Sequence, residues 1–399
     1  MDQGNRPIAL TRVSGDGNSL TATVAQADIT VTAELAADGD MLIGQMKQGA
    51  VTLPLSLRRR TVGTPAPVPL SFKRPQTPIP PFPYRNEEVS FAGKGGMIAG
   101  TLTTPPGKPR AAVLLIAGSG RQTRDEDVAG HKPFLVLADH LARHNIAVLR
   151  TDKRGVGKST GDYDAATTAD FADDAADAIA WLRQRADVDP ANIGLIGHSE
   201  GGYIAPMLAA KDPRIAFVVL MAAPALKGRD MLELQQEVLA RHSGVQDADI
   251  QKASRRFRRA VAALEGTVDA AAAQAAVTAV LVTDGMPQAA AQAQARTMAK
   301  PWFSFMLHHD PSSFLARVRC PVLAINGEKD LQVPPRENLA VTRAALAGHP
   351  DADIRELPGL NHMFQAAPTG LPGEYGQIEQ TMAPLALDMI ADWIVRRSL

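Results

Sequence analysis

The sequence predicts an α/β protein built on a doubly wound, mostly parallel sheet, with a helical insertion and a small N-terminal β module. From about residue 87, short apolar runs alternate with helical patterns, as expected for parallel strands covered by helices. A long apolar helical pattern closes the chain. The expected strands are Ala112–Ala117, Ile146–Leu149, Ile193–Ile196, Phe217–Met221, Val322–Ile325 and Ile354–Leu357. The expected helices are Phe134–Arg143, Asp170–Arg185, Gly202–Ala210, Asn338–Ala347 and Gln377–Val395.

The N-terminal part of the chain has a different pattern. Short alternating segments such as Ile29–Ala33 are separated by turn clusters, which is typical of strands in a small β module. A proline-rich stretch from Pro65 to Pro83 disfavours regular structure and predicts a spacer. The expected division is a β module at residues 1–72, a linker at 73–86 and a main domain at 87–399.

One interval of the main domain lacks any strand pattern. Between Pro224 and Pro311 the sequence is helical and rich in alanine and glutamine. Ligands bind such sheets at the carboxyl ends of the strands, where this insertion emerges. We therefore expect residues 225–311 to form a lid over the active site. The alternative is a helical decoration with no role in binding.

Composition excludes several kinds of partner. Acidic and basic residues number 42 each, so no net field attracts nucleic acid. No run of about 18 apolar residues exists, so no membrane-spanning helix is expected. The single cysteine, Cys320, cannot form an internal disulfide and fits either redox compartment. The expected location is periplasmic or secreted if a leader precedes this sequence, and cytoplasmic otherwise.

Ser199 is the predicted nucleophile. It lies in Gly197-His198-Ser199-Glu200-Gly201, between a predicted strand and a predicted helix. A G-x-S-x-G turn in this context exposes the serine on a strained corner, and the helix N-terminus favours negative charge on the substrate oxygen. The pattern also arises by chance, and a plain glycine-rich turn is the alternative.

A serine hydroxyl needs a base and a group that orients the base. In this architecture the acid and then the histidine follow the serine along the chain. The strand Val322–Ile325 leads into Glu328 and Asp330, and the last strand leads into His362. We expect His362 as the base and Asp330 as the acid, with Glu328 as the alternative acid.

An oxyanion hole requires two backbone N–H groups. One is expected from Glu200, the residue after the nucleophile, and the other from the loop that follows the first parallel strand. Ser119 is the preferred donor in that loop, and Gly120 is the alternative.

Two other patterns are weaker than they look. Gly155–Thr160 resembles the end of a phosphate-binding loop, but the pattern requires glycine where Asp152 stands. The cluster His308-His309-Asp310 suggests a metal site, but adjacent side chains on a helix diverge. We therefore expect no nucleotide, metal or other cofactor.

Together these stretches resemble a bacterial branch of the α/β-hydrolase superfamily, serine esterases with a small N-terminal β-domain. The matching stretches are Gly118–Glu126 (similar to GSGPxDRDE), Leu149–Ser159 (DxRGxGxS), Gly197–Gly202, Pro301–Phe303, Pro321–Pro335 and Leu357–Gln365. The resemblance implies a serine carboxylesterase that hydrolyses small or medium acyl esters through an acyl-enzyme. A peptidase, an acyl-CoA thioesterase or acyltransferase, and more distantly a non-catalytic binding protein are the alternatives.

The resemblance also gives expectations about the pocket and the partners. The candidate pocket residues are Arg121, His198, Trp302, Phe303 and Phe305. Arg121 stands where relatives have proline, which would favour polar or anionic acyl groups. Asp2-Gln3-Gly4 resembles the middle of the β-domain, so either a second copy completes it in a homodimer or the sequence omits part of it. The expected partner is otherwise a small-molecule ester.

Overall fold

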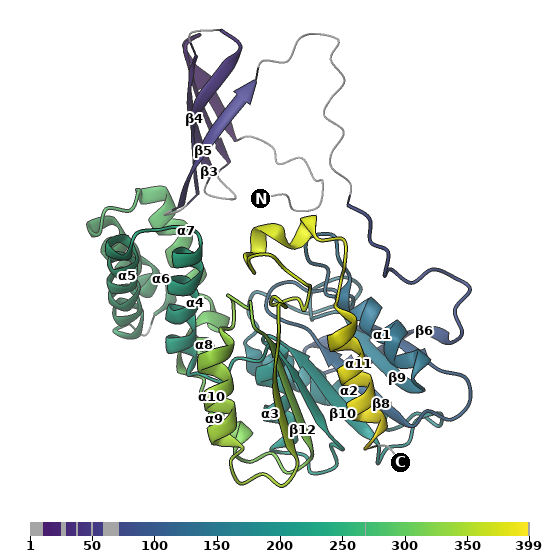
Figure 1. Cartoon of the computed structure of the whole chain (residues 1–399). Helices are drawn as coiled ribbons and strands as arrows, with labels where there is room; N and C mark the ends of the chain where they lie inside the picture. The colour runs from purple at the N-terminus through teal and green to yellow at the C-terminus, as the bar shows by residue number, and fades with distance from the viewer. Residues whose placement is uncertain are drawn as a thin grey trace. The chain divides into compact units, whose positions relative to one another are not determined.

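The structure is a computed structural model that describes residues 11–24, 29–36, 39–48, 51–58, 72–267 and 269–397. These residues form two compact units (Figure 1). The larger unit comprises Phe72–Phe257 and Lys300–Leu399, and the smaller one comprises Asp2–Ser71 and Arg258–Ala299.

An eight-stranded, mostly parallel sheet organises the larger unit, in the order β13-β12-β11-β10-β8-β9-β7-β6. All six strands expected from the sequence are present. The pair β6 and β7, which continues the sheet antiparallel beyond β9, was not predicted. Exposed and buried residues are mixed along β6, so it shows no apolar run. The strands are β6 Arg85–Gly93, β7 Gly96–Thr104, β8 Ala111–Ile116, β9 Ile146–Thr151, β10 Ile193–His198, β11 Val218–Met221, β12 Val322–Gly327 and β13 Ala352–Leu357.

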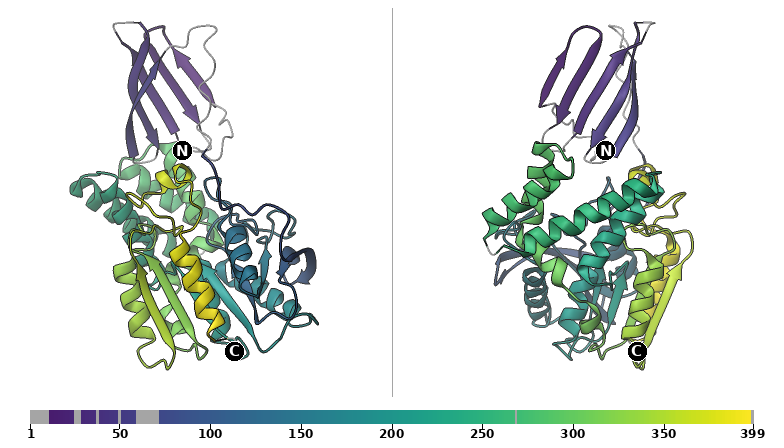
Figure 2. Two further views of the ribbon diagram at one scale, coloured as in Figure 1. Left: turned by 45° about the vertical axis from the view of Figure 1, so that its right-hand side comes forward. Right: turned by 90° about the vertical axis from the view of Figure 1, so that its left-hand side faces the viewer.

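Helices cover both faces of this sheet (Figure 2). On β8, Leu114 belongs to the hydrophobic cluster beneath α2 and α3, whereas Val113 and Leu115 belong to the cluster beneath α1 and α11. This alternation is the two-residue period of a strand buried on both faces. The helices are α1 Pro133–Arg143, α2 Thr168–Leu182, α3 Gly201–Ala209, α10 Pro335–Ala345 and α11 Pro384–Val395.

The last helix is shorter than the sequence predicts. We expected it to begin at Gln377, but Pro372–Gln377 forms a separate 3-10 turn and α11 begins at Pro384. Proline is favoured in the first helical turn because it has no N–H to leave unpaired there. The apolar sequence pattern therefore extends from the end of the 3-10 turn through α11, although the helix itself begins only at Pro384.

The insertion between β11 and β12 is helical throughout, as predicted. Its helices divide between the two units: α4, α8 and α9 belong to the larger, α6 and α7 to the smaller, and α5 is shared between them. The expected lid at residues 225–311 is therefore not one compact body. The helices are α4 Gly228–His242, α5 Asp247–Glu265, α6 Ala270–Thr283, α7 Gln288–Met298, α8 Pro301–His308 and α9 Ser312–Leu315.

The N-terminal residues form a separate antiparallel sheet of five sequential strands, in agreement with the predicted β module. Its first turn is closed by the Asp16 carboxylate, which accepts hydrogen bonds from the N–H groups of Asn18 and Ser19. Completion of this sheet by a second chain stays a prediction. The strands are β1 Arg12–Gly15, β2 Ser19–Val24, β3 Ile29–Leu35, β4 Met41–Gln48 and β5 Val51–Arg58.

Residues 73–86 are not the free spacer that their prolines suggest. The Arg74 guanidinium donates to four backbone carbonyls of the larger unit outside its own segment, among them those of Gly130 and Gly376. The Gln76 amide accepts from the N–H of Thr381 and donates to the carbonyl of Met382. This segment is therefore fixed on the larger unit, whereas the rest of the proline-rich stretch, from Pro65, lies outside the described residues.

Trp393 on α11 gives a test of this core. Its side chain is 1 % exposed and packs edge-on against Phe217 of the opposing layer. We expect Trp393→Ala to lower the free energy of unfolding by about 3–5 kcal/mol, because the cavity cannot close completely. Leu385 on the same helix is 45 % exposed, so Leu385→Ala should change it by less than about 0.5 kcal/mol. Urea unfolding measures both; equal losses would contradict this packing.

Candidate active site

Ser199 occupies a strained turn between β10 and α3. Its φ is 51°, a left-handed conformation that is unusual for a residue other than glycine. Two glycines allow α3 to approach the sheet. A Cβ on Gly201 would lie 2.0 Å from the carbonyl oxygen of Ile116, and one on Gly202 would lie 2.3 Å from the Cβ of Ala223. The geometry is that of the elbow predicted from the sequence, with the half-buried serine at its corner.

Asp330 and His362 meet at the carboxyl ends of β12 and β13. The Nδ1 of His362 lies 2.8 Å from the Oδ2 of Asp330, and both side chains are buried. The other carboxylate oxygen of Asp330 accepts the N–H groups of Gln332 and Val333 at 2.9 and 2.8 Å. The carboxylate is thus held from both sides. It favours the tautomer with hydrogen on Nδ1, which leaves Nε2 as a proton acceptor.

Glu328, the alternative acid, contacts a different group. Its exposed side chain accepts the N–H of Gly359 at 2.7 Å. Of the two acids considered from the sequence, only Asp330 hydrogen-bonds His362.

The loops after β8, β10 and β13 come together at the carboxyl end of the sheet. The ring of His362 lies 4.8 Å from the ring of His198, which precedes Ser199. From the loop after β8, a Cβ on Gly118 would lie 3.2 Å from the Cβ of Ser199. The residues predicted from separate parts of the sequence are therefore close together in space.

The predicted oxyanion donors also belong to this edge. Within the described part of the chain, the backbone N–H groups of Ser119 and Glu200 donate no hydrogen bond to a protein acceptor. Gly120, the alternative, has a positive φ of 94°, and its backbone hydrogen-bonds the Tyr163 hydroxyl. Ser119 is therefore better placed than Gly120 to serve a ligand.

His198, a predicted pocket residue, is held by hydrogen bonds at both ring nitrogens, and its role in a pocket stays a prediction. It is buried, with Nδ1 2.9 Å from the Glu126 carboxylate and Nε2 3.0 Å from the carbonyl oxygen of His362. Both partners are acceptors, so the ring needs hydrogen on both nitrogens to satisfy them. Burial disfavours the charged ring, but Glu126 outweighs it and raises the pKa of His198 above its usual value. No local pattern predicted this pair, because 72 residues separate its members along the chain.

Glu200 is a second buried acid beside the nucleophile. Its Oε1 accepts a hydrogen bond from the Thr168 hydroxyl at 2.6 Å and from Trp302 Nε1 at 2.5 Å. Trp302 belongs to α8, so this carboxylate connects the elbow to the helical insertion. The sequence assigned a role only to the Glu200 backbone.

The remaining pocket candidates are dispersed. Phe303 is buried in the core, and Phe305 stacks on His309 at 5.2 Å. Arg121 is exposed; it pairs with Asp164 at 2.6 Å and lies over the Tyr163 ring. None of these contacts brings Phe303 or Phe305 to the serine, so their role in a pocket stays a prediction.

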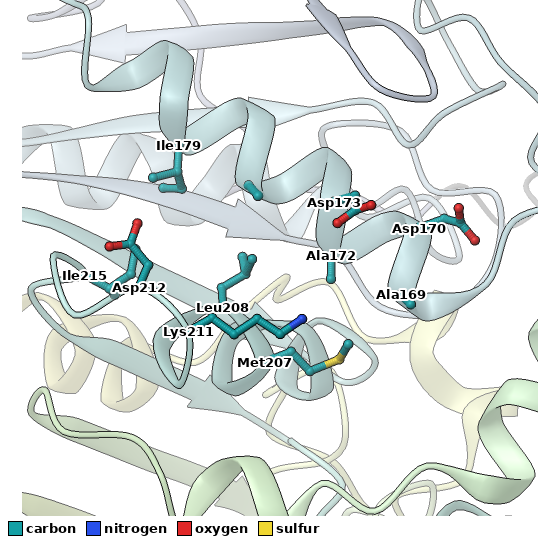
Figure 3. Close-up of a pocket in the computed structure, with 11 residues that line it drawn as sticks. Ala169, Asp170, Ala172, Asp173, Ile179, Met207, Leu208, Lys211, Asp212 and Ile215 are labelled. Atoms are coloured by element: carbon teal, nitrogen blue, oxygen red, sulfur yellow. The ribbon is translucent and has the colours of Figure 1, made fainter.

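A cavity of about 290 Å³ lies between α2 and α3 (Figure 3). Ala172 and Ile179 of α2 face Met207 and Leu208 of α3, and Lys211 just after α3, across it. Its lining includes none of the serine, acid and histidine described above, so it is not the place where their chemistry would occur.

The two weak patterns have structural explanations. The Asp152 carboxylate accepts the N–H of Lys158 at 3.0 Å and pairs with Arg124. The Asp152 carboxylate thus occupies the place in this loop where a phosphate would have to bind. His308 is exposed, whereas His309 is buried against Tyr203, so their rings do not converge. Across the described ranges no group of three or more His, Cys, Asp or Glu could hold a metal ion. No helix in those ranges is both long and apolar enough to cross a membrane.

Comparison with known proteins assigns the chain to a family. Residues 94–347 match the model described as X-Pro dipeptidyl-peptidase (S15 family). The chain belongs to this family. It is also 24% identical to the esterase EstD of Thermotoga maritima over 326 residues, which cover 80% of this chain and 69% of that protein. A second relative, the uncharacterized protein YfhR of Salmonella typhimurium, is 30% identical over 31% of this chain and 40% of that one.

Two solved structures are similar to this chain in fold at low sequence identity. The α/β hydrolase GrgF from Penicillium has a TM-score of 0.50 at 17% identity, covering 79% of this chain and 99% of its own. A Pyrococcus furiosus esterase has a TM-score of 0.47 at 16% identity, covering 75% and 87%. The chain is therefore a serine hydrolase of the α/β-hydrolase superfamily, as its motifs predicted.

The Glu126–His198 pair predicts a pH-dependent stability. Because folding raises the pKa of His198, its contribution is complete below its unfolded pKa of about 6.5 and is lost as pH rises through the folded value. The difference in free energy of unfolding between the wild type and His198→Gln should therefore shrink between pH 5.5 and 9. Urea unfolding measures it. His242→Gln, at an exposed histidine, is the control; a difference that is constant with pH would contradict the pair.

Proposed function

We propose that this serine hydrolase is a carboxylic ester hydrolase whose triad is Ser199, His362 and Asp330. The observation that carries the proposal is the buried hydrogen bond of 2.8 Å between Asp330 and His362, beside the strained turn that holds Ser199. A serine on a sharp turn with an oriented imidazole is the arrangement that nucleophilic catalysis requires.

The reaction follows from these roles. The Nε2 of His362 takes the proton from the Ser199 hydroxyl as its oxygen attacks the ester carbonyl. The N–H groups of Ser119 and Glu200 stabilise the oxyanion that forms. The imidazolium then gives its proton to the leaving alcohol, and an acyl-enzyme remains. Water, activated by His362 in the same way, hydrolyses the acyl-enzyme and restores the serine.

A peptidase is the second candidate, because the family description names a dipeptidyl-peptidase. An enzyme of that kind must hold a free N-terminal ammonium, for which a carboxylate is the natural partner. Besides Asp330, which holds His362, the two buried acids beside the elbow are already engaged: Glu126 with His198, and Glu200 with Thr168 and Trp302. This favours esters, as does the likeness to an esterase over 80% of the chain.

The acyl group is proposed to be small or medium in size. Trp302 donates to Glu200, the residue after the nucleophile, and so places α8 close to the elbow. A helix in this position leaves less room for a long acyl chain. The lid role of the insertion as a whole is part of the same proposal.

Replacement of the nucleophile tests the mechanism. We expect Ser199→Ala to lower kcat for aryl esters by at least about 10⁴-fold, since no other group can form the acyl-enzyme. The measurement is release of the aryl alcohol from esters of graded acyl length. Ser119→Ala is the matched control, because the proposed donor there is the backbone; it should keep activity within a few-fold of the wild type.

The same assay distinguishes the substrates. An X-Pro aryl amide and an acyl-CoA are tested beside the esters on the wild type and on Ser199→Ala. Faster turnover of the amide or the thioester than of every ester would replace the esterase proposal by the corresponding alternative. Ester hydrolysis that survives Ser199→Ala would refute the triad itself.

The choice of acid has its own test. Asp330→Asn should lower kcat by about 10⁴-fold, because the amide no longer favours the productive tautomer of His362. Glu328→Gln should leave kcat within about threefold, since Glu328 contacts only the Gly359 N–H. Steady-state kinetics of both variants decide between them; the reverse order of effects would assign the acid to Glu328.

A further inference from the structure

Lys153 is a buried lysine beside the candidate oxyanion hole. It follows β9, and its side chain is 8 % exposed. Its Nζ donates to the carbonyl oxygen of Gly118 at 2.7 Å and to the Oε2 of Glu200 at 2.8 Å. The ammonium also lies 4.5 Å from the centre of the Phe171 ring. The sequence motifs gave this lysine no role, and neither does the triad chemistry.

The first contact fixes the direction of an oxyanion donor. The carbonyl of Gly118 and the N–H of Ser119 belong to the same peptide group. In a planar trans peptide these two bonds point in opposite directions. An ammonium held on the carbonyl oxygen therefore determines where the Ser119 N–H points. It also polarises the peptide, which strengthens the N–H as a donor.

The second contact fixes the other donor. Glu200 contributes its N–H to the proposed oxyanion hole, and its side-chain carboxylate binds the same ammonium. Thr168 and Trp302 occupy the other oxygen of that carboxylate, so its position is determined on both sides. One cation thus spans the loop after β8 and the turn after β10, whose two N–H groups must act on one substrate oxygen.

Glu126 supports the same loop from the preceding peptide. Its Oε1 accepts the N–H of Gly118 at 2.6 Å while it also holds His198. The peptides on both sides of Gly118 are therefore held by buried charged groups, one by Glu126 and one by Lys153. Such a loop is fixed before substrate arrives, which is what an oxyanion hole needs in order to lower the barrier.

We propose that Lys153 is a positioning residue that holds the two oxyanion donors, the N–H groups of Ser119 and Glu200, in register through the Gly118 carbonyl and the Glu200 carboxylate. The inference rests on the proposed nucleophilic role of Ser199, but not on the ester preference. A purely structural role for Lys153, neutralising the buried Glu200, would affect folding but not the reaction at Ser199.

The test separates these two roles with paired variants. Lys153→Met alone would leave the Glu200 carboxylate buried without its cation, so the variant is combined with Glu200→Gln and compared with Glu200→Gln alone. Loss of one aligned oxyanion donor should lower kcat for an aryl ester by about 10²–10³-fold. The KM should stay within about threefold, since the ground-state ester depends little on the oxyanion hole. The rate of inactivation by a fluorophosphonate, whose oxygen occupies the same hole, should fall in parallel.

Lys158→Met is the matched control. Lys158 lies in the same loop, but it is exposed and pairs with Glu88, so kcat and the inactivation rate should remain as in the wild type. If the Lys153→Met, Glu200→Gln variant reacts within threefold of Glu200→Gln, Lys153 has no positioning role. A drop in melting temperature without a drop in either rate leads to the same conclusion.

A second variant covers a failure of the first to fold. Lys153→Met with Glu200→Leu replaces the ion pair by apolar side chains, a change that is often neutral or stabilising for buried pairs. It is measured against the wild type by the same two rates, with the same expected losses. Fluorophosphonate labelling needs only a nucleophilic serine, so it distinguishes the two proposals. A wild type that is labelled but inactive on esters contradicts the esterase proposal alone; equal labelling of the variants contradicts the role of Lys153.

Discussion

The geometry at Ser199 depends on how closely α3 approaches the sheet. The chain reverses from β10 into α3 within a few residues, and Ser199 takes a left-handed backbone conformation to do so. Gly201 and Gly202 meet neighbouring atoms at distances that no side chain could occupy. The strain is offset by the buried core on either side of the sheet, and the serine is held at the corner without freedom to relax.

A second constraint is the disposal of buried charge around that corner. Three acids lie beside it, and each has a specific partner: Asp330 has His362, Glu126 has His198, and Glu200 has Lys153. A buried carboxylate without a partner would be costly. Because every partner comes from a distant part of the chain, the pairs also fix the loops against one another. The same three pairs of contacts therefore neutralise the buried charges and position the loops of the site.

The fold was largely predictable from periodicity and turn residues. Five of the six predicted strands, β8 to β12, are almost wholly buried and form apolar runs, so their positions were evident. β6 was missed because its exposure is mixed, and β7 because glycine and threonine interrupt its buried residues, so that neither forms an apolar run. The predicted start of α11 was too early. The apolar pattern already begins in the residues before Pro384, where the helix itself begins. Residues 73–86 look like a spacer by composition, and only the contacts of Arg74 show them fixed in place.

The sequence by itself determined the class of sheet and predicted the serine, with the acid and the histidine after it in that order, because each of these patterns lies within a few neighbouring residues. Only the tertiary structure shows that Asp330 rather than Glu328 hydrogen-bonds His362, that Glu126 holds the buried His198, and that Lys153 reaches the carbonyl of Gly118. These facts depend on contacts between residues that are 32 to 72 positions apart along the chain. Local patterns carry no information on such distances, and only the folded sheet brings the residues together.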